Sequence, residues 1–316
     1  MGKIEKATTD ITAVERGSTD VNYVYRATTL IWQKSNFLLD NNYATGSIAA
    51  FSLRKLSSTY TGPAIVVRRA SDNATQSINF LANGDLDQSA ISTFCGASNG
   101  FVRMWLNQYP GGAHAIASLN NRQPQIYSSA SGVFNFAGKP YMNFTGAQTF
   151  LVSNFSTPAL YTHITSGSFS SYFVEHGDST GDKFYCYSLG GSYVSAIRTT
   201  KLEDSGALSF NTTGLKYLTF MIAGLTASLA SGTYGTGGSL RLFEKAVEKS
   251  LTYRSLANER ILANNNIVTK NLNLFSRNQS QLFSTGQYFE ILHFDLPKDY
   301  QSLSSIHSNI ATYWQL

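Results

Sequence analysis

Charged residues are scarce in this sequence: they make up 14% of its 316 residues, while aromatic residues alone make up 13%. The net charge of +5 comes from dispersed basic residues, with no block of like charges. Binding to nucleic acid rests on phosphate neutralisation and usually needs a concentrated basic face. The composition therefore predicts no nucleic-acid partner. Arg68 and Arg69 could face an acidic glycan or simply flank a strand.

Cysteine is nearly absent, and Cys95 and Cys186 are the two in the chain. Neither lies in a C-x-x-C or His-rich cluster of the kind that binds metal or does redox chemistry. The two could pair only if the fold brought them together, and two buried free thiols are the favoured expectation. The loop from Asp178 to Asp182 could hold Ca²⁺, but a hairpin turn explains it more simply. The sequence predicts no metal and no cofactor.

Long apolar runs are also missing, and none approaches the ~20 residues that a membrane span requires. The first residues, MGKIEKATTDITAVERG, lack the apolar centre of a signal peptide. We therefore expect no membrane contact and no secretion by the chain itself.

The abundant residues are strand formers and turn formers, including 18 Tyr, 20 Phe and 25 Gly. From Ala44 onward, turn signals recur at about the 8 to 12 residue spacing of an all-β sandwich. The runs between them predict strands at residues 64–68, 101–105, 169–174, 217–223 and 288–292. After Pro297, apolar residues at helical spacing predict a short C-terminal helix, namely Leu303, Ile306, Ile310 and Tyr313. Residues 242–262 fit a helix or strands.

The N-terminal region contains a short internal repeat, because residues 11–21 and 21–31 superpose with an offset of ten. Each unit predicts a strand, a tight turn and a strand, and two such units cannot bury enough surface to stand alone. The segment resembles the V-Y-x-G-S-T-x-I repeats of phage tail and head-appendage proteins, which implies attachment to other virion proteins. An ordinary N-terminal hairpin is the alternative. The residues expected to serve attachment are Val14, Val21, Tyr23, Val24, Tyr25 and Ile31.

Two further resemblances concern the main part of the chain. Between Ala50 and Ile126, the segments AFSLRKL, YTGPAIVVRRASDN, NGDLD, TFCGASNGFVRMWLNQYPGGAHA and QPQI resemble the opening of arabinofuranosidase B catalytic domains. Residues 272–277 and 286–294 resemble the last two strands of concanavalin-like and laminin-G-like domains. Together they imply a concanavalin-like jelly-roll β-sandwich at residues 41–316, preceded by an N-terminal β attachment segment at residues 1–40.

The catalytic motifs of the arabinofuranosidase family are not matched. A retaining glycosidase needs two carboxylates about 5 to 5.5 Å apart, and no carboxylate after Asn143 lies in a segment that fits the family pattern. The family's Y-D-Q-S-G-N-G loop is Leu106-Asn-Gln-Tyr-Pro-Gly-Gly112 here, so its aspartate is replaced by an asparagine. Trp105 is expected in the core. No catalytic residue is predicted, and the residues that could contact a carbohydrate are Asn107, Gln108, Tyr109 and His114, the last more simply a polar turn residue.

These features favour a non-enzymatic phage virion protein, such as a head fibre, decoration or tail fibre component. Its lectin-like domain would bind host surface polysaccharide, on the virion surface, in a homo-oligomer for which the phage resemblance implies a trimer. The alternative is a retaining, arabinofuranosidase-like glycoside hydrolase that acts on a capsular or cell-surface glycan. Two carboxylates close together in one cleft would favour that alternative.

Overall fold

The structure is a computed structural model, and it describes only part of the chain. The described residues are 15–16, 19–20, 23–26, 29–33, 37–146, 150–152, 169–177, 183–189, 192–199, 214–223, 239–244, 247–249, 272–274, 285–294 and 298–316. Several predicted features lie outside them: Val14, Val21, the loop of residues 178–182, and residues 250–262.

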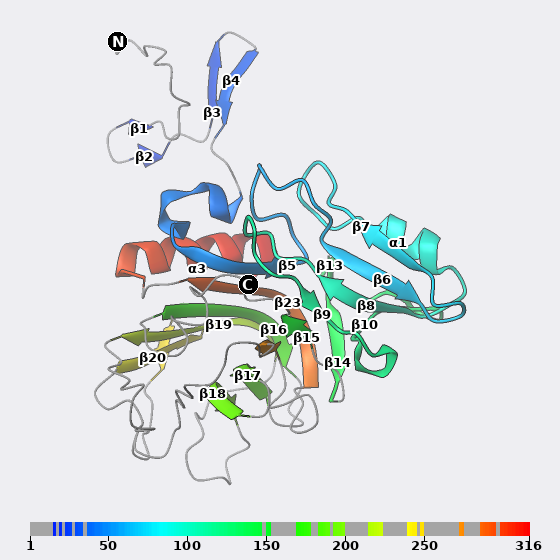
Figure 1. Cartoon of the computed structure of the whole chain (residues 1–316). Coiled ribbons are helices and arrows are strands. Elements are labelled where there is room, and N and C mark those ends of the chain that lie inside the picture. Colours follow the sequence, from blue (N-terminus) through cyan, green and yellow to red (C-terminus); the bar gives the residue numbers. More distant parts are fainter. Residues whose placement is uncertain are drawn as a thin grey trace.

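An antiparallel layer of long strands forms the centre of the molecule (Figure 1). The hydrogen-bonded order of its strands is β5, β23, β16, β19, β20 and β21. In addition, β14 pairs with the first residues of β23. The bounds are β5 (Ser47–Ser52), β14 (Met142–Thr145), β16 (Phe169–Gly177), β19 (Gly214–Ala223), β20 (Ser239–Glu244), β21 (Val247–Lys249) and β23 (Thr285–Phe294).

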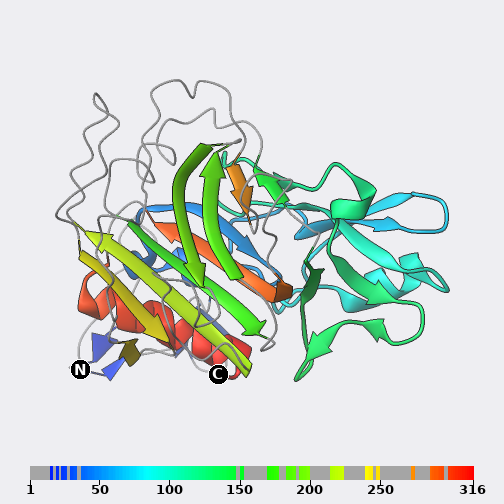
Figure 2. The same ribbon diagram turned by 90° about the horizontal axis from the view of Figure 1, so that it is seen from below.

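A second layer lies across one face of the first, as the two views show (Figures 1 and 2). Its strands pair in the order β9, β15, β22, β17 and β18, again antiparallel. The bounds are β9 (Ala115–Ile116), β15 (Phe150–Val152), β17 (Lys183–Leu189), β18 (Ser192–Thr199) and β22 (Leu272–Leu274). The two layers make the sandwich that the sequence predicts.

A smaller sheet extends the sandwich at one end and carries the first helix (Figure 2). Its strands pair in the order β7, β6, β8 and β10, and β8 continues into the second layer by pairing with β9. The elements are β6 (Ile65–Arg69), β7 (Thr75–Ile78), α1 (Gln88–Cys95), β8 (Gly100–Trp105), η3 (Asn120–Arg122), β10 (Gln125–Ser128), β11 (Gly132–Val133), β12 (Asn135–Phe136) and β13 (Lys139–Pro140).

The remaining elements lie near the termini. The helix α3 (Tyr300–Trp314) covers the face of the central layer opposite the second layer, beside η1 (Leu38–Asp40) and η2 (Asn42–Ala44) (Figure 1). Two separate hairpins precede them: β1 (Glu15–Arg16) with β2 (Thr19–Asp20), and β3 (Tyr23–Arg26) with β4 (Thr29–Gln33). They agree with the strand–turn–strand pattern of the repeat. Their role in attachment stays a prediction.

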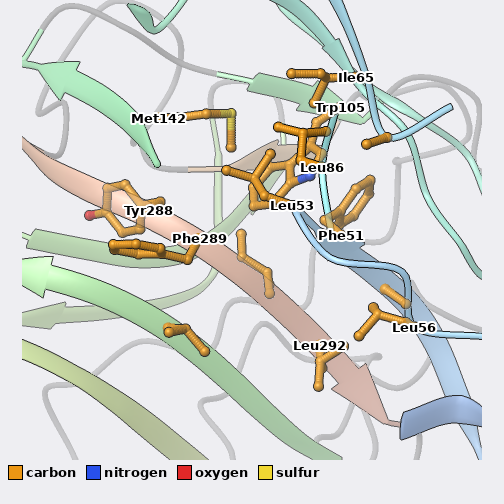
Figure 3. Close-up of a cluster of buried hydrophobic side chains, with 14 of the residues drawn as sticks. Phe51, Leu53, Leu56, Ile65, Leu86, Trp105, Met142, Tyr288, Phe289 and Leu292 are labelled. Atoms are coloured by element: carbon orange, nitrogen blue, oxygen red, sulfur yellow. The ribbon is translucent and has the colours of Figure 1, made fainter. Parts of the chain in front are cut away.

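One hydrophobic core extends from the smaller sheet across the central layer to α3, and Figure 3 shows part of it where the smaller sheet meets the central layer. Trp105 is fully buried there and packs on Phe51 with ring centroids 5.6 Å apart, which confirms its expected place in the core. Cys95 is a buried free thiol, and burial raises its pKa to about 11, so it is inert at neutral pH. Within the described residues, no helix is long and apolar enough to cross a membrane.

The structure confirms the predicted all-β class and the predicted C-terminal helix. The helix α1 was not predicted. The signals for α1 were present: Asp87 caps its first turn by accepting a hydrogen bond from the backbone N–H of Ala90, and Gly96 follows its last residue. Only Ile91 and Cys95 of this helix are buried. One short apolar stripe of two residues is too weak a pattern to stand out from neighbouring strands.

A buried ion pair joins α3 to the central layer. Arg54, which follows β5, donates from Nε and Nη2 to Glu290 of β23 at 2.6 and 2.9 Å. Ser52 and the indole N–H of Trp314 also donate to this carboxylate, at 2.7 and 3.3 Å. Arg54 is 3% exposed and Glu290 is fully buried. The pair thus fixes one strand end and the last turn of α3 around one carboxylate.

Acid is expected to destabilise the fold through His307, which α3 buries against Tyr172 of β16 with ring centroids 5.7 Å apart. Burial lowers the pKa of His307 to about 4. The unfolded chain, with a histidine pKa of about 6.5, therefore binds the extra proton first, and stability is lost as the pH falls from 6.5 towards 4. We expect this group to contribute a loss of about 2 kcal/mol in the free energy of unfolding between pH 7 and pH 5.

Urea titrations at the two pH values measure this loss, and His307→Gln is the variant to compare, because glutamine cannot titrate. The variant should show a smaller difference between pH 7 and pH 5, whatever its stability at pH 7. An unchanged difference would assign the acid sensitivity to other groups.

Candidate functional site

Glu175 is a fully buried carboxylate near the end of β16. Tyr172 of this strand contacts α3, and side chains alternate between the faces of a strand, so Glu175 and Phe173 point away from α3 towards the second layer. Buried glutamate is rare because removal of a carboxylate from water is costly. An apolar residue would serve packing better at this position, which makes Glu175 a candidate for function.

Three residues of neighbouring strands lie near Glu175 on the face of the central layer that is turned towards the second layer, which we call the inner face. Tyr288 of β23 lies directly opposite Glu175 in the strand register, just beyond an irregularity in the pairing of β16 with β23. Met142 lies opposite Tyr288 on the other side, and Phe144 packs edge-on against the Tyr288 ring with centroids 5.1 Å apart. All four are buried, and Figure 3 shows Met142 and Tyr288 on adjacent strands. We call these four residues the inner-face cluster.

Several other described carboxylates make identified structural contacts. Glu290 holds Arg54 on the opposite face of the layer. Asp85 binds Lys139 at 3.1 Å, and Asp72 binds Arg69 at 2.6 Å. Asp87 and Asp299 accept hydrogen bonds from the first turns of α1 and α3. Glu175 differs from these carboxylates because it is fully buried on the face that is turned towards the second layer, which makes the inner-face cluster the candidate site.

Asn107, which the sequence predicts as a sugar contact, is 4% exposed. Its Oδ1 accepts hydrogen bonds from the backbone N–H groups of Ala50 and Tyr109, at 2.9 and 3.0 Å. Its Nδ2 donates to the carbonyl oxygen of Ala113 at 3.3 Å. A β-carbon added at Gly112 would lie 2.2 Å from that Nδ2, so this loop needs glycine there. Asn107 thus organises its own loop and ties it to β5.

Gln108 is also directed into the protein, with 1% of its surface exposed. Its Oε1 accepts from the backbone N–H of Leu56 at 2.7 Å, and its Nε2 donates to the carbonyl oxygens of Arg54 and Ser52, at 2.7 and 3.3 Å. These bonds satisfy the backbone of the segment that follows β5. An amide used in this way has little capacity left for a sugar hydroxyl.

Tyr109 and His114 complete the set of predicted sugar contacts. Tyr109 is 37% exposed and is the most exposed member of the set. His114 accepts a hydrogen bond on Nδ1 from the backbone N–H of Asn107 at 3.1 Å, and burial lowers its pKa, so it is neutral near pH 7. The structure brings the four residues together in one loop. Carbohydrate binding by this loop stays a prediction.

Glu175 was not predicted as a site residue, because no motif surrounds it. A signal was available: Glu175 follows three residues that would suit a buried strand, Tyr172 to Val174, in a sequence where few charges occur at all. Its position opposite Tyr288 needs strand pairing between residues more than a hundred positions apart. In the described part of the chain, no three His, Cys, Asp or Glu residues gather as metal ligands.

Comparison with known proteins identifies related architectures. Residues 40–149 match the family described as alpha-L-arabinofuranosidase B, catalytic. Two crystal structures of arabinofuranosidases resemble the fold: one is a GH54 enzyme soaked with a cyclic sulfate inhibitor (TM-score 0.52, 14% identity), and the other is complexed with arabinofuranosyl-alpha-1,2-xylobiose (TM-score 0.55, 15% identity). They cover 84% and 85% of this chain, which spans 62% and 63% of theirs. No curated protein sequence matches.

The chain is therefore an arabinofuranosidase-like β-sandwich, and this finding corrects the functional prediction. The expectation of a non-enzymatic phage virion protein, whether a head fibre, decoration or tail fibre component, is wrong. So is the expectation that the chain is not an enzyme, since the matched family is a catalytic domain. The error arose because the absence of matching carboxylate motifs was taken as evidence that the chain has no catalytic residues. Location on the virion surface, virion partners and trimer formation stay untested predictions.

Proposed function

We propose that this chain is a glycoside hydrolase that releases arabinofuranosyl or closely related residues from a polysaccharide. The observation that carries the proposal is the match of residues 40–149 to an arabinofuranosidase catalytic domain. The likeness in fold covers 84–85% of the chain and so supports the same architecture beyond residue 149.

Within this proposal, Glu175 is one of the two carboxylates that glycoside hydrolysis requires. In a retaining mechanism, one carboxylate attacks the sugar and forms a covalent glycosyl-enzyme intermediate. The other protonates the leaving group and then activates water. Glu175 is fully buried, and the strand register places it between Tyr288 of β23 and Lys216 of β19. Such a position excludes bulk water, and this strengthens the electrostatic interaction of a carboxylate with a developing positive charge on the sugar ring. The second carboxylate is not assigned.

Hydrolysis of 4-nitrophenyl α-L-arabinofuranoside tests the proposal, together with sugar release from an arabinofuranosyl-branched xylan. We expect 4-nitrophenol release that is saturable in substrate and proportional to protein concentration. The corresponding arabinopyranoside should be a poor substrate. NMR of the first-formed sugar should show retained anomeric configuration. Absence of release from either substrate, by protein whose thermal unfolding is cooperative, would contradict the proposed activity.

A further inference from the structure

Arg68 and Arg69 are adjacent on β6 but have different surroundings. Arg69 binds Asp72 through two hydrogen bonds, from Nε to Oδ1 at 3.0 Å and from Nη2 to Oδ2 at 2.6 Å. Its Nη1 donates to the carbonyl oxygen of Phe94 at 2.7 Å. The charge of Arg69 is therefore matched by a carboxylate at the protein surface.

The charge of Arg68 has no such match, although the side chain is only 7% exposed. Its Nε donates to Oε1 of Gln123 at 2.7 Å, and Nη1 donates to Oδ1 of Asn73 at 3.0 Å. Its Nη2 donates to the carbonyl oxygen of Asn120 at 3.5 Å. Every acceptor is neutral, and none of the carboxylates in the described residues forms an ion pair with Arg68. Burial of a charge without an opposite charge is costly, and it lowers the pKa of Arg68.

The guanidinium group of Arg68 is held firmly in place. It lies over the ring of Phe101, its register partner on β8, at 5.0 Å from the ring centroid. Asn120 also donates to Asn73 Oδ1 at 3.1 Å, and Gln123 donates to the carbonyl oxygen of Ala117 at 3.0 Å. A guanidinium has five N–H groups, and three of those of Arg68 make the bonds described. Two are left for a ligand.

A second cation lies on the same side of this sheet. Arg103 is exposed, and it alternates with the buried Val102 two residues after Phe101. The carbonyl oxygen of Arg103 accepts from the backbone N–H of Ala117, at the start of the segment that reaches over Arg68. Beside this segment, the side chain of Leu119 is 61% exposed. Two guanidinium groups, several amides and exposed apolar surface suit a ligand that is anionic, rich in hydroxyl groups and partly apolar.

We propose that the outer face of β6 and β8 is an accessory binding site for an acidic glycan, in which Arg68 and Arg103 bind the carboxylate of a uronic acid residue. The planar guanidinium fork of Arg68 matches a planar carboxylate. The amides of Asn73 and Asn120 lie beside it to accept and donate hydrogen bonds with sugar hydroxyls. This inference goes beyond the proposed hydrolase activity and does not depend on it, because the residues lie on β6 and β8, whereas the inner-face cluster lies on β14, β16 and β23.

Calorimetric titration of the full chain with tetragalacturonate, and with a neutral arabino-oligosaccharide of the same length, tests the site. We expect the acidic ligand to bind at least ten-fold more tightly in low salt. Arg68→Gln and Arg103→Gln should each lower that affinity about ten-fold. Arg69→Gln is the matched control: it removes the same charge from the neighbouring residue, and its affinity should equal that of the original protein.

Three results would overturn the proposal: equal binding of the acidic and neutral ligands, an equal loss for Arg69→Gln and Arg68→Gln, or tighter binding of a sulfated oligosaccharide than of the uronate. The second would indicate diffuse charge attraction, and the third a different anion. If Arg68→Gln fails to fold, Arg103→Gln decides, because that side chain is exposed. Hydrolysis of the aryl arabinofuranoside by the same preparations separates this site from the proposed activity.

Discussion

Replacement of Glu175 by glutamine is expected to lower kcat for 4-nitrophenyl α-L-arabinofuranoside by at least about 10³-fold. Glutamine keeps the shape of the side chain but can neither attack a sugar carbon nor transfer a proton. Glu175 is fully buried, and its register partners are Tyr288 of β23 and Lys216 of β19. The variant should still unfold cooperatively on heating, so that the loss of kcat reports the missing carboxylate. Steady-state kinetics and thermal unfolding test these two expectations.

Asp87→Asn is the matched control for this experiment. It makes the same change from carboxylate to amide, and asparagine is also a good N-cap, so α1 should keep its first turn and kcat should not change. Glu175→Ala with added azide tests the role further, because a small anion can replace a missing nucleophile. Full activity in Glu175→Gln would remove Glu175 from the mechanism. A large loss of both activity and stability would indicate a structural role.

Breaking the buried ion pair is expected to have the largest effect on stability. In Glu290→Gln, the Arg54 guanidinium would remain buried without its counter-charge, and Trp314 and Ser52 would lose a charged acceptor. Such an uncompensated buried charge typically costs about 3 to 5 kcal/mol. We expect a loss of that size in the free energy of unfolding, measured by urea denaturation at pH 7, and the end of α3 should become exposed to hydrogen exchange first.

Two further variants separate the lost pair from a general effect of charge. The double variant Arg54→Met, Glu290→Leu replaces both partners by apolar side chains and should recover most of the loss, because no unpaired charge remains. Asp72→Asn breaks the exposed pair with Arg69 and should leave stability close to that of the original protein. If Glu290→Gln were as stable as Asp72→Asn, the buried network would not hold α3 to the sheet.

Much of the fold could be predicted because its signals are local. Turn residues at regular intervals and β-forming runs identified β6, β8, β16, β19 and β23. The spacing of Leu303, Ile306 and Ile310 identified α3, and all three are buried in the core. The second layer was less accessible, because strands of two or three residues, such as β9, β15 and β22, carry no periodic pattern of their own.

The site depended on information that no local pattern contains. Asn107 and Gln108 were candidates for sugar contact because amides can bind hydroxyl groups, yet both are used by the backbone around β5, more than fifty residues earlier in the sequence. The sequence alone does not distinguish the roles of Glu175 and Glu290. Pairing of β16 with β23 places the two side chains on opposite faces of the central layer. Glu290 binds Arg54, whereas Glu175 lies opposite Tyr288 in the strand register.

The sequence by itself determined the β class, the C-terminal helix and the likeness to an arabinofuranosidase-like sandwich, because strand periodicity, turn residues and family-like segments are local features of the chain. Tertiary structure decided which polar residues are structural and which are available for chemistry. It paired Arg69 with Asp72, left Arg68 among neutral amides, and buried Glu175 between Tyr288 of β23 and Lys216 of β19 in the strand register. Burial and charge pairing arise from contacts between distant segments, and these two quantities set the chemical capacity of a side chain.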